Sequence, residues 1–239
     1  MYGPYVPIYP VDSYSDSDFI SSLPMPPPYE SVVFSYDDIH YGWKFRKNLG
    51  MYVQINDKIY GPYNDVGDLI FFGDGSKYAW VYKKNDKEYI QINDKLYGPY
   101  DITGRIRFSI NGSKYGWWYK KDNKWYVQIN DGGLNKSKSY GPYEDYENYA
   151  LNILVFSNDG SRFGWAFRKG NDWYLQVNDE ICGPYSDVWD LRIFNNESKY
   201  VWEYRGKDAL YYVQINDKTY GPYFSVDKLR FSDNGSKYG

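Results

Sequence analysis

The feature that most constrains this chain is a sequence unit of about 40 residues that recurs along it. The unit ends in Gly-Pro-Tyr, and its successive copies are spaced 37 to 43 residues apart. The tripeptide begins at Gly61, Gly98, Gly141, Gly183 and Gly221, with an isolated copy at Gly3. A pentad Val/Ile/Leu-Gln-Ile/Val-Asn-Asp begins at Val53, Ile90, Val127, Leu175 and Val213. Tandem units of this length indicate a repeat architecture, in which each unit folds as one small supersecondary structure.

The unit from residue 105 to residue 143 predicts four short strands. We expect them at residues 105–109, 114–121, 125–130 and 139–143. Turn residues such as Asn111-Gly112 separate them, because Gly and Asn accept the positive φ that tight turns need. Pro142 cannot donate to a ladder, so the fourth strand is expected at a sheet edge. Four antiparallel strands that end in an outer edge are typical of a β-propeller blade.

Composition agrees with an all-β chain and excludes several classes of protein. Aromatic residues make up 22% of the chain, and strands favour aromatic residues. A net charge of −3 does not indicate nucleic-acid binding, and no apolar run is long enough for a membrane span. The single cysteine excludes an intrachain disulfide. No signal peptide is visible, so the cytoplasm is the default location, with export or a fragment left open.

The repeated motif resembles a known family of repeats. Phe156-Ser157-Asn158-Asp159-Gly160 and Phe108-Ser109-Ile110-Asn111-Gly112 are similar to the Phe-Ser-Pro-Asp-Gly core of the WD40-like (PD40) repeats in TolB-type β-propellers. The resemblance covers residues 31–239. The family's proline is absent from every copy, and Asp37-Asp38 and Asn196-Glu197 replace the Asp-Gly turn. The resemblance implies a propeller fold and a scaffold role, although a fold by itself does not specify a function.

We therefore predict two regions. Residues 1–30 form an irregular segment rich in Pro, Ser and Asp with one outer-type strand, and residues 31–239 form a propeller of four-stranded antiparallel blades. The register predicts five complete repeats and a sixth that is split between the two ends of the chain. Three explanations stay open: a fragment of a longer propeller, a last blade that the two ends form together, or strands supplied by another chain, which would produce oligomers.

Two sets of residues are candidates for binding a ligand or partner. Exposed aromatic rings can stack on sugars or pack on proteins, and the alternative is packing between blades. Basic pairs that end each second strand would form a ring on one face of a closed propeller, and the alternative is a solvated hairpin tip. The candidates are Tyr63, Tyr100, Tyr143, Tyr185, Tyr223, Lys84, Lys121 and Lys169.

No catalytic or metal-binding motif is recognisable, so we expect neither an enzyme nor a cofactor. His40 is the only histidine, and Cys182 replaces a tyrosine of the sister copies. The first hypothesis is a non-enzymatic scaffold for protein–protein interaction that self-associates through its incomplete last blade. One alternative is a carbohydrate-binding module, because Lys124-Trp125-Tyr126 is similar to aromatic cell-wall-binding repeats. The other is the propeller portion of a longer hydrolase.

Overall fold

The computed structural model describes residues 32–132, 136–143, 154–194, 199–226 and 231 of the chain. The predicted segment 1–30 and most of the last partial unit lie outside these residues. The described residues form strands β1 (Val33–Phe34), β2 (Tyr41–Lys47), β3 (Gly50–Ile55), β4 (Lys58–Tyr63), β5 (Asp65–Val66), β6 (Ile70–Phe72), β7 (Lys77–Lys84), β8 (Lys87–Ile92), β9 (Lys95–Tyr100), β10 (Ile102–Thr103), β11 (Arg107–Phe108), β12 (Lys114–Lys121), β13 (Lys124–Asp131), β14 (Ser137–Tyr143), β15 (Val155–Phe156), β16 (Phe163–Lys169), β17 (Asp172–Val177), β18 (Glu180–Tyr185), β19 (Asp187–Ile193), β20 (Tyr200–Arg205), β21 (Tyr211–Ile215) and β22 (Lys218–Tyr223).

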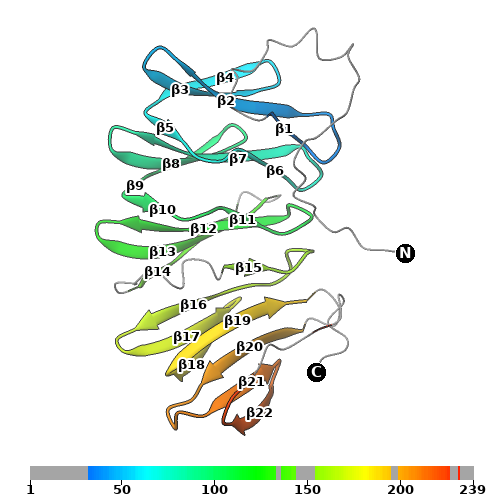
Figure 1. Ribbon diagram of the computed structural model, residues 1–239, viewed down its shortest axis with the longest axis vertical. Helices are drawn as coiled ribbons and strands as arrows, with labels where there is room; N and C mark the ends of the chain where they lie inside the picture. Colours follow the sequence, from blue (N-terminus) through cyan, green and yellow to red (C-terminus); the bar gives the residue numbers. More distant parts are fainter. Residues whose placement is uncertain (1–31, 133–135, 144–153, 195–198, 227–230, 232–239) are drawn as a thin grey trace.

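These strands form five antiparallel sheets in chain order, one for each repeat. The first, fourth and fifth sheets follow the orders β1-β2-β3-β4, β15-β16-β17-β18 and β19-β20-β21-β22. The second and third have a divided inner strand, because β5 and β6 both pair with β7, and β10 and β11 both pair with β12. Figure 1 shows the sheets stacked along the long axis, with the first and the fifth at opposite ends. The all-β prediction is confirmed, whereas ring closure and a sixth blade stay predictions.

The predicted strands of the third repeat agree closely with the observed ones. β12 has the predicted bounds, and β13 and β14 are each longer than expected. The first strand is shorter than predicted, since only Arg107 and Phe108 pair with β12, while Ile102 and Thr103 pair further along it. The Gly-Pro-Tyr strands β4, β9, β14, β18 and β22 all lie at a sheet edge, as predicted.

The glycine of Gly-Pro-Tyr is required by the backbone at this edge. Gly98 has a φ of 120°, and its Gly-Pro peptide bond is cis, as in all five edge strands. A Cβ atom at Gly98 would lie 2.9 Å from the Tyr89 ring and 3.0 Å from the Glu88 carbonyl oxygen. Both the φ and the close approach exclude a larger residue, which explains why the motif recurs with glycine.

The asparagine of the pentad closes the turn between the third and fourth strands. Asn93 has a φ of 48°, a conformation that Asn tolerates better than most residues. Its Oδ1 accepts a hydrogen bond from the Tyr78 amide at 2.9 Å, and its carbonyl accepts one from Gln91 Nε2 at 2.6 Å. The same contacts recur at Asn56, Asn178 and Asn216. The pentad therefore encodes a turn.

A second turn, between the inner strand and the second strand, explains the Phe-Ser motif. The buried Ser109 donates to Asn111 Oδ1 at 2.8 Å and accepts from the Lys114 amide at 3.0 Å. Gly112 follows with a φ of 65°. In the first repeat Asp38 takes the place of this glycine with a φ of 56°. Asp37-Asp38, which replaces the Asp-Gly of the family motif, therefore forms the same turn.

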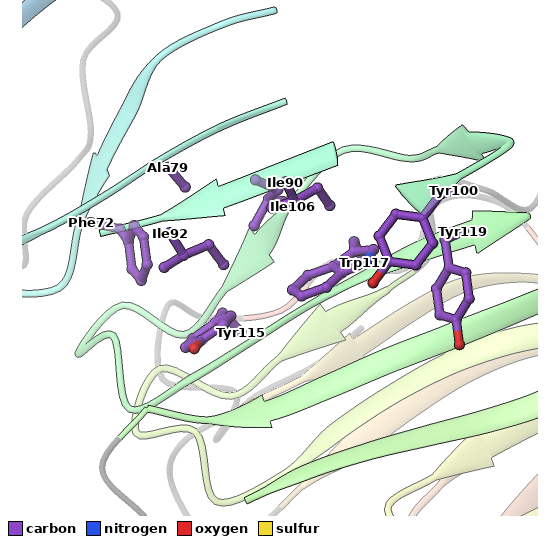
Figure 2. Close-up of a cluster of buried hydrophobic side chains, with 9 residues drawn as sticks. All are labelled: Phe72, Ala79, Ile90, Ile92, Tyr100, Ile106, Tyr115, Trp117 and Tyr119. Atoms are coloured by element: carbon purple, nitrogen blue, oxygen red, sulfur yellow. The ribbon is translucent and has the colours of Figure 1, made fainter. Parts of the chain in front are cut away.

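The core lies between successive sheets and repeats along the stack. Figure 2 shows the cluster between the second and third sheets, where Ile90 and Ile92 of β8 face Tyr115 and Trp117 of β12. A tryptophan recurs on the second strand of every described sheet, and all five are buried. They are Trp43, Trp80, Trp117, Trp165 and Trp202.

Candidate functional site

The tyrosines of the Gly-Pro-Tyr motif lie between neighbouring sheets. Each of the first four packs against a ring of the next sheet's second strand. The ring centroids are 4.0 Å apart for Tyr63–Tyr82, 4.4 Å for Tyr100–Tyr119, 4.6 Å for Tyr143–Phe167 and 4.2 Å for Tyr185–Tyr204. Tyr223 is 44% exposed. Four of the five tyrosine rings thus pack between sheets, and the binding of a partner by this set of tyrosines stays a prediction.

Burial in these contacts changes the acidity of the tyrosines. Loss of hydration raises the pKa of Tyr63, Tyr100 and Tyr143 to about 12, and the neighbouring tyrosine rings add a smaller increase in each case. The Tyr143 hydroxyl accepts a hydrogen bond from Trp165 Nε1 at 3.2 Å, which acts in the opposite direction. These hydroxyls stay protonated and neutral over the physiological pH range.

The predicted basic residues lie at the hairpins between the second and third strands. Lys84, Lys121 and Lys169 end β7, β12 and β16, and all three are exposed. No ion pair to any of them is found in the described part of the chain. Figure 1 shows these hairpins along one side of the stack. Among the described residues the basic tips follow one another along this side of the stack, and the ring expected on a closed propeller stays a prediction.

A cavity brings members of both predicted sets together between the third and fourth sheets. It has a volume of about 430 Å³, which falls in the usual range for small-molecule sites. The edge strand β14 forms one wall, and the face of β16, β17 and β18 forms the other. Residues that matter most for its chemistry are Tyr143, Phe167, Lys169, Tyr174, Gln176 and Ile181.

The walls of this cavity combine aromatic surface with a few polar groups. Phe167 stacks on Tyr143 and, 5.5 Å away on its own sheet, on Tyr174. Ile181 lies across the ladder from Gln176 and is 61% exposed. Gln176 itself is 6% exposed, and its Nε2 donates to the Asn178 carbonyl at 2.9 Å. The prediction from sequence included Tyr143 and Lys169 but missed Gln176 and Ile181, although the repeated Gln of the pentad was a visible signal.

A second surface of interest is the outer face of the fifth sheet. At two of the four described interfaces, a lysine near the start of the edge strand bonds to the pentad aspartate of the next sheet: Lys58 to Asp94, and Lys138 to Asp179 at 2.6 Å. Lys218 holds the same place on β22, and no ion pair to it is found among the described residues. Phe224, the residue that directly follows β22, is 95% exposed.

The described residues contain no group of three or more His, Cys, Asp or Glu side chains placed to hold a metal ion. His40 Nδ1 lies 3.0 Å from Asn56 Nδ2 in the turn of the first repeat. Cys182 is half-buried, and loss of hydration raises the pKa of its thiol, with a smaller contribution from Glu180. A helix that could span a membrane does not occur in the described part of the chain.

Comparison with known proteins gives structural neighbours alone. No protein-family model matches the chain, and no curated protein matches it. Similar solved structures include TolB from Acinetobacter baumannii, with 13% identity, a TM-score of 0.41 and coverage of 87% of this chain and 56% of that one. The Dos1 propeller has 12% identity, a TM-score of 0.46 and coverage of 87% and 63%. The β-propeller domain of the trilobed protease from Pyrococcus furiosus has 11% identity, a TM-score of 0.35 and coverage of 80% and 84%. The chain thus spans less than two thirds of the first two structures.

Proposed function

We propose that this chain is a non-enzymatic β-propeller-type scaffold for protein–protein interaction, and that one of its partners is a second copy of the chain. The observation that supports the proposal is the repeated contact between sheets: a Gly-Pro-Tyr tyrosine packs on a ring of the next sheet at all four described interfaces, and a lysine–aspartate pair joins two of them. Such a contact can be extended by any sheet that presents the complementary face. Repeat proteins of this kind present large surfaces and need no catalytic group to act.

The fifth sheet carries one half of this contact. Lys218, Tyr223 and Phe224 lie on or next to β22, which is the edge strand of the fifth sheet. Among the described residues, Val226 and Phe231 pack on the core of this sheet. The first sheet carries the other half, with Asp57 in the place of Asp94 and Phe45 in the place of Tyr82. We propose that β22 of one copy packs on β2 and β3 of another, with Lys218 bonded to Asp57 and Tyr223 stacked on Phe45.

Charge reversal tests this contact. We expect wild-type protein to show a mass that rises with concentration in sedimentation-velocity or light-scattering measurements. Lys218→Glu should shift the chain towards monomer, and Asp57→Lys in the same chain should restore association, because the ion pair is then reversed. Lys124→Glu, at an exposed hairpin position, is the matched control and should leave the mass unchanged. A monomer at every concentration, or association that Lys218→Glu does not alter, contradicts the proposal.

A further inference from the structure

The cavity between the third and fourth sheets has two cations on its walls and no carboxylate among the described residues that line it. Arg168 and Lys169, the last two residues of β16, both line the cavity. Asp172 lies across the ladder from Lys169, but its carboxylate bonds to Lys207 in the hairpin of the fifth sheet. Lys169 is exposed and has no ion pair in the described part of the chain. The lining of the cavity therefore carries a net positive charge.

Arg168 is half-buried, and its charge has no carboxylate partner among the described residues. Its Nε atom is buried without a hydrogen bond, and its guanidinium lies over the Trp173 ring, 5.7 Å from the centroid. In the second sheet the cation that matches Arg168 is Lys83, and its cross-strand neighbour is the carboxylate of Glu88. In the fourth sheet Trp173 holds the place of Glu88. A partly buried cation without a counter-charge is unfavourable, so an anion that reaches Arg168 is stabilised.

The part of the cavity beyond these cations is largely apolar. Tyr143, Phe167 and Tyr174 form a continuous row of rings, and Tyr174 ends the row and is partly exposed. Pro142 of β14 and Ile181 of β18 add further apolar surface to the walls. A flat apolar group packs well on such a surface, because aromatic rings offer it large faces.

The third sheet shows which polar groups this wall lacks. There Tyr119 holds the place of Phe167, and its hydroxyl donates to Ser139 at 3.3 Å. Ser139 in turn holds the place of Ile181, across the ladder from the pentad glutamine. With Phe167 and Ile181, the fourth sheet has neither hydroxyl at this part of the cavity.

We propose that this cavity binds a small aromatic acid, with its carboxylate held by Lys169 and Arg168 and its ring packed on Tyr174 and Pro142. An anion at the edge of a flat apolar ring matches both the cations at the hairpin end and the rings beyond them. A neutral ring compound would leave the two cations without a counter-charge, and a carboxylate without a ring would leave the apolar wall uncovered. This site is separate from the self-association surface on the fifth sheet, so either proposal can fail without the other.

Calorimetric titration of the full chain tests the proposal. The probes are benzoate, phenylacetate, cinnamate and indoleacetate, with the neutral amide of each acid and with acetate for comparison. We expect saturable binding of at least one aromatic acid, binding of its amide that is weaker by about 5- to 10-fold, and no binding of acetate. The peptides Gly-Gly-Phe and Gly-Gly-Trp distinguish two sources of the ligand. Tighter binding of a peptide than of the free acids indicates the C-terminal residue of a partner chain, and weaker binding indicates a free small molecule.

Two substitutions locate the ligand in the cavity. Lys169→Gln should weaken binding of the acid by about 5-fold and leave that of the amide unchanged. Lys84→Gln, the same change at the matching residue of the second sheet, is the control and should leave both affinities unchanged.

Phe167→Tyr is the second substitution and introduces the residue that the second, third and fifth sheets carry at this place, so the chain should fold. Its added hydroxyl should weaken binding of acid and amide alike by about 2- to 10-fold, because it narrows the apolar wall. Three results overturn the proposal. The first is no heat of binding from any of the four acids at about 10 mM, where even a site of ~1 mM affinity is filled. The second is equal affinity for an acid and its amide, which means that the cations take no part. The third is acid binding that Lys169→Gln and Phe167→Tyr both leave unchanged, which places the ligand elsewhere.

Discussion

Asn93, in the turn between β8 and β9, offers a direct test of how the repeat is held together. Its side-chain Oδ1 accepts the hydrogen bond of the Tyr78 amide at 2.9 Å, and its φ of 48° is in the left-handed region. Asn93 therefore contributes to stability in two ways, as the acceptor of this hydrogen bond and as a residue that tolerates the left-handed φ, and three substitutions separate the two contributions. Alanine loses both the acceptor and the tolerance for this φ, glycine loses the acceptor alone, and aspartate keeps both.

The expected magnitudes follow from these two terms. Leaving the partly buried Tyr78 amide without an acceptor costs about 1–2 kcal/mol, the lower part of the range for a lost hydrogen bond. Placing alanine at this φ costs about 1–2 kcal/mol more, because its Cβ crowds the backbone. We therefore expect losses in the free energy of unfolding of about 2–4 kcal/mol for Asn93→Ala, about 1–2 kcal/mol for Asn93→Gly, and less than about 0.5 kcal/mol for Asn93→Asp.

Urea denaturation followed by tryptophan fluorescence measures these differences. The chain offers its own control at Asn130, the matching asparagine of the third repeat. Asn130 continues β13 without a positive φ and is 1% exposed, and neither polar atom of its side chain has a hydrogen-bond partner among the described residues. Asn130→Ala should cost less than about 1 kcal/mol, since no hydrogen bond is lost. Equal losses at Asn93 and Asn130, or Asn93→Gly as costly as Asn93→Ala, would refute this reasoning.

Two further predictions concern the packing between sheets. Ile90 is fully buried, so Ile90→Ala should lower the free energy of unfolding by about 2–5 kcal/mol in the same assay, whereas Ile59→Ala, at a residue that is 56% exposed, should change it by less than about 0.5 kcal/mol. The second is alkaline destabilisation. The folded chain holds the pKa of Tyr63, Tyr100 and Tyr143 at about 12, above the usual value of 10. As the pH rises, the unfolded chain therefore releases these protons before the folded chain does. Their contribution to the free energy of unfolding is complete below pH 10 and falls as the pH rises to 12. Urea midpoints between pH 8 and 12 measure this fall, Tyr100→Phe should reduce it, and a flat profile would show that the hydroxyls are not buried as described.

The periodic pattern predicted three of the four strands of the third repeat closely. Pro142 placed the outer edge correctly, because a residue without an amide hydrogen cannot lie inside a ladder. Asn111-Gly112 likewise predicted a turn from the conformations those residues accept. The divided inner strand was missed, since only the tertiary partner β12 reveals that Ile102 and Thr103 also pair.

The candidate site was only partly predictable for a related reason. Tyr143 and Lys169 were identified by their recurrence, but Gln176 looked like one more member of a repeated pentad. It becomes a candidate only because it lines the cavity between the third and fourth sheets, and which sheets meet is not visible in a single repeat read along the chain.

The sequence by itself determined the repeat, its strands and turns, and the edge position of Gly-Pro-Tyr, because these depend on the conformations and hydrogen bonds of neighbouring residues. Only the tertiary structure decided which faces of the sheets meet. It placed four of the five recurrent tyrosines between sheets and arranged the basic hairpins as a column along the stack. It also opened a cavity between the third and fourth sheets. Contacts between sheets join side chains from separate repeats, and their packing depends on the whole stack.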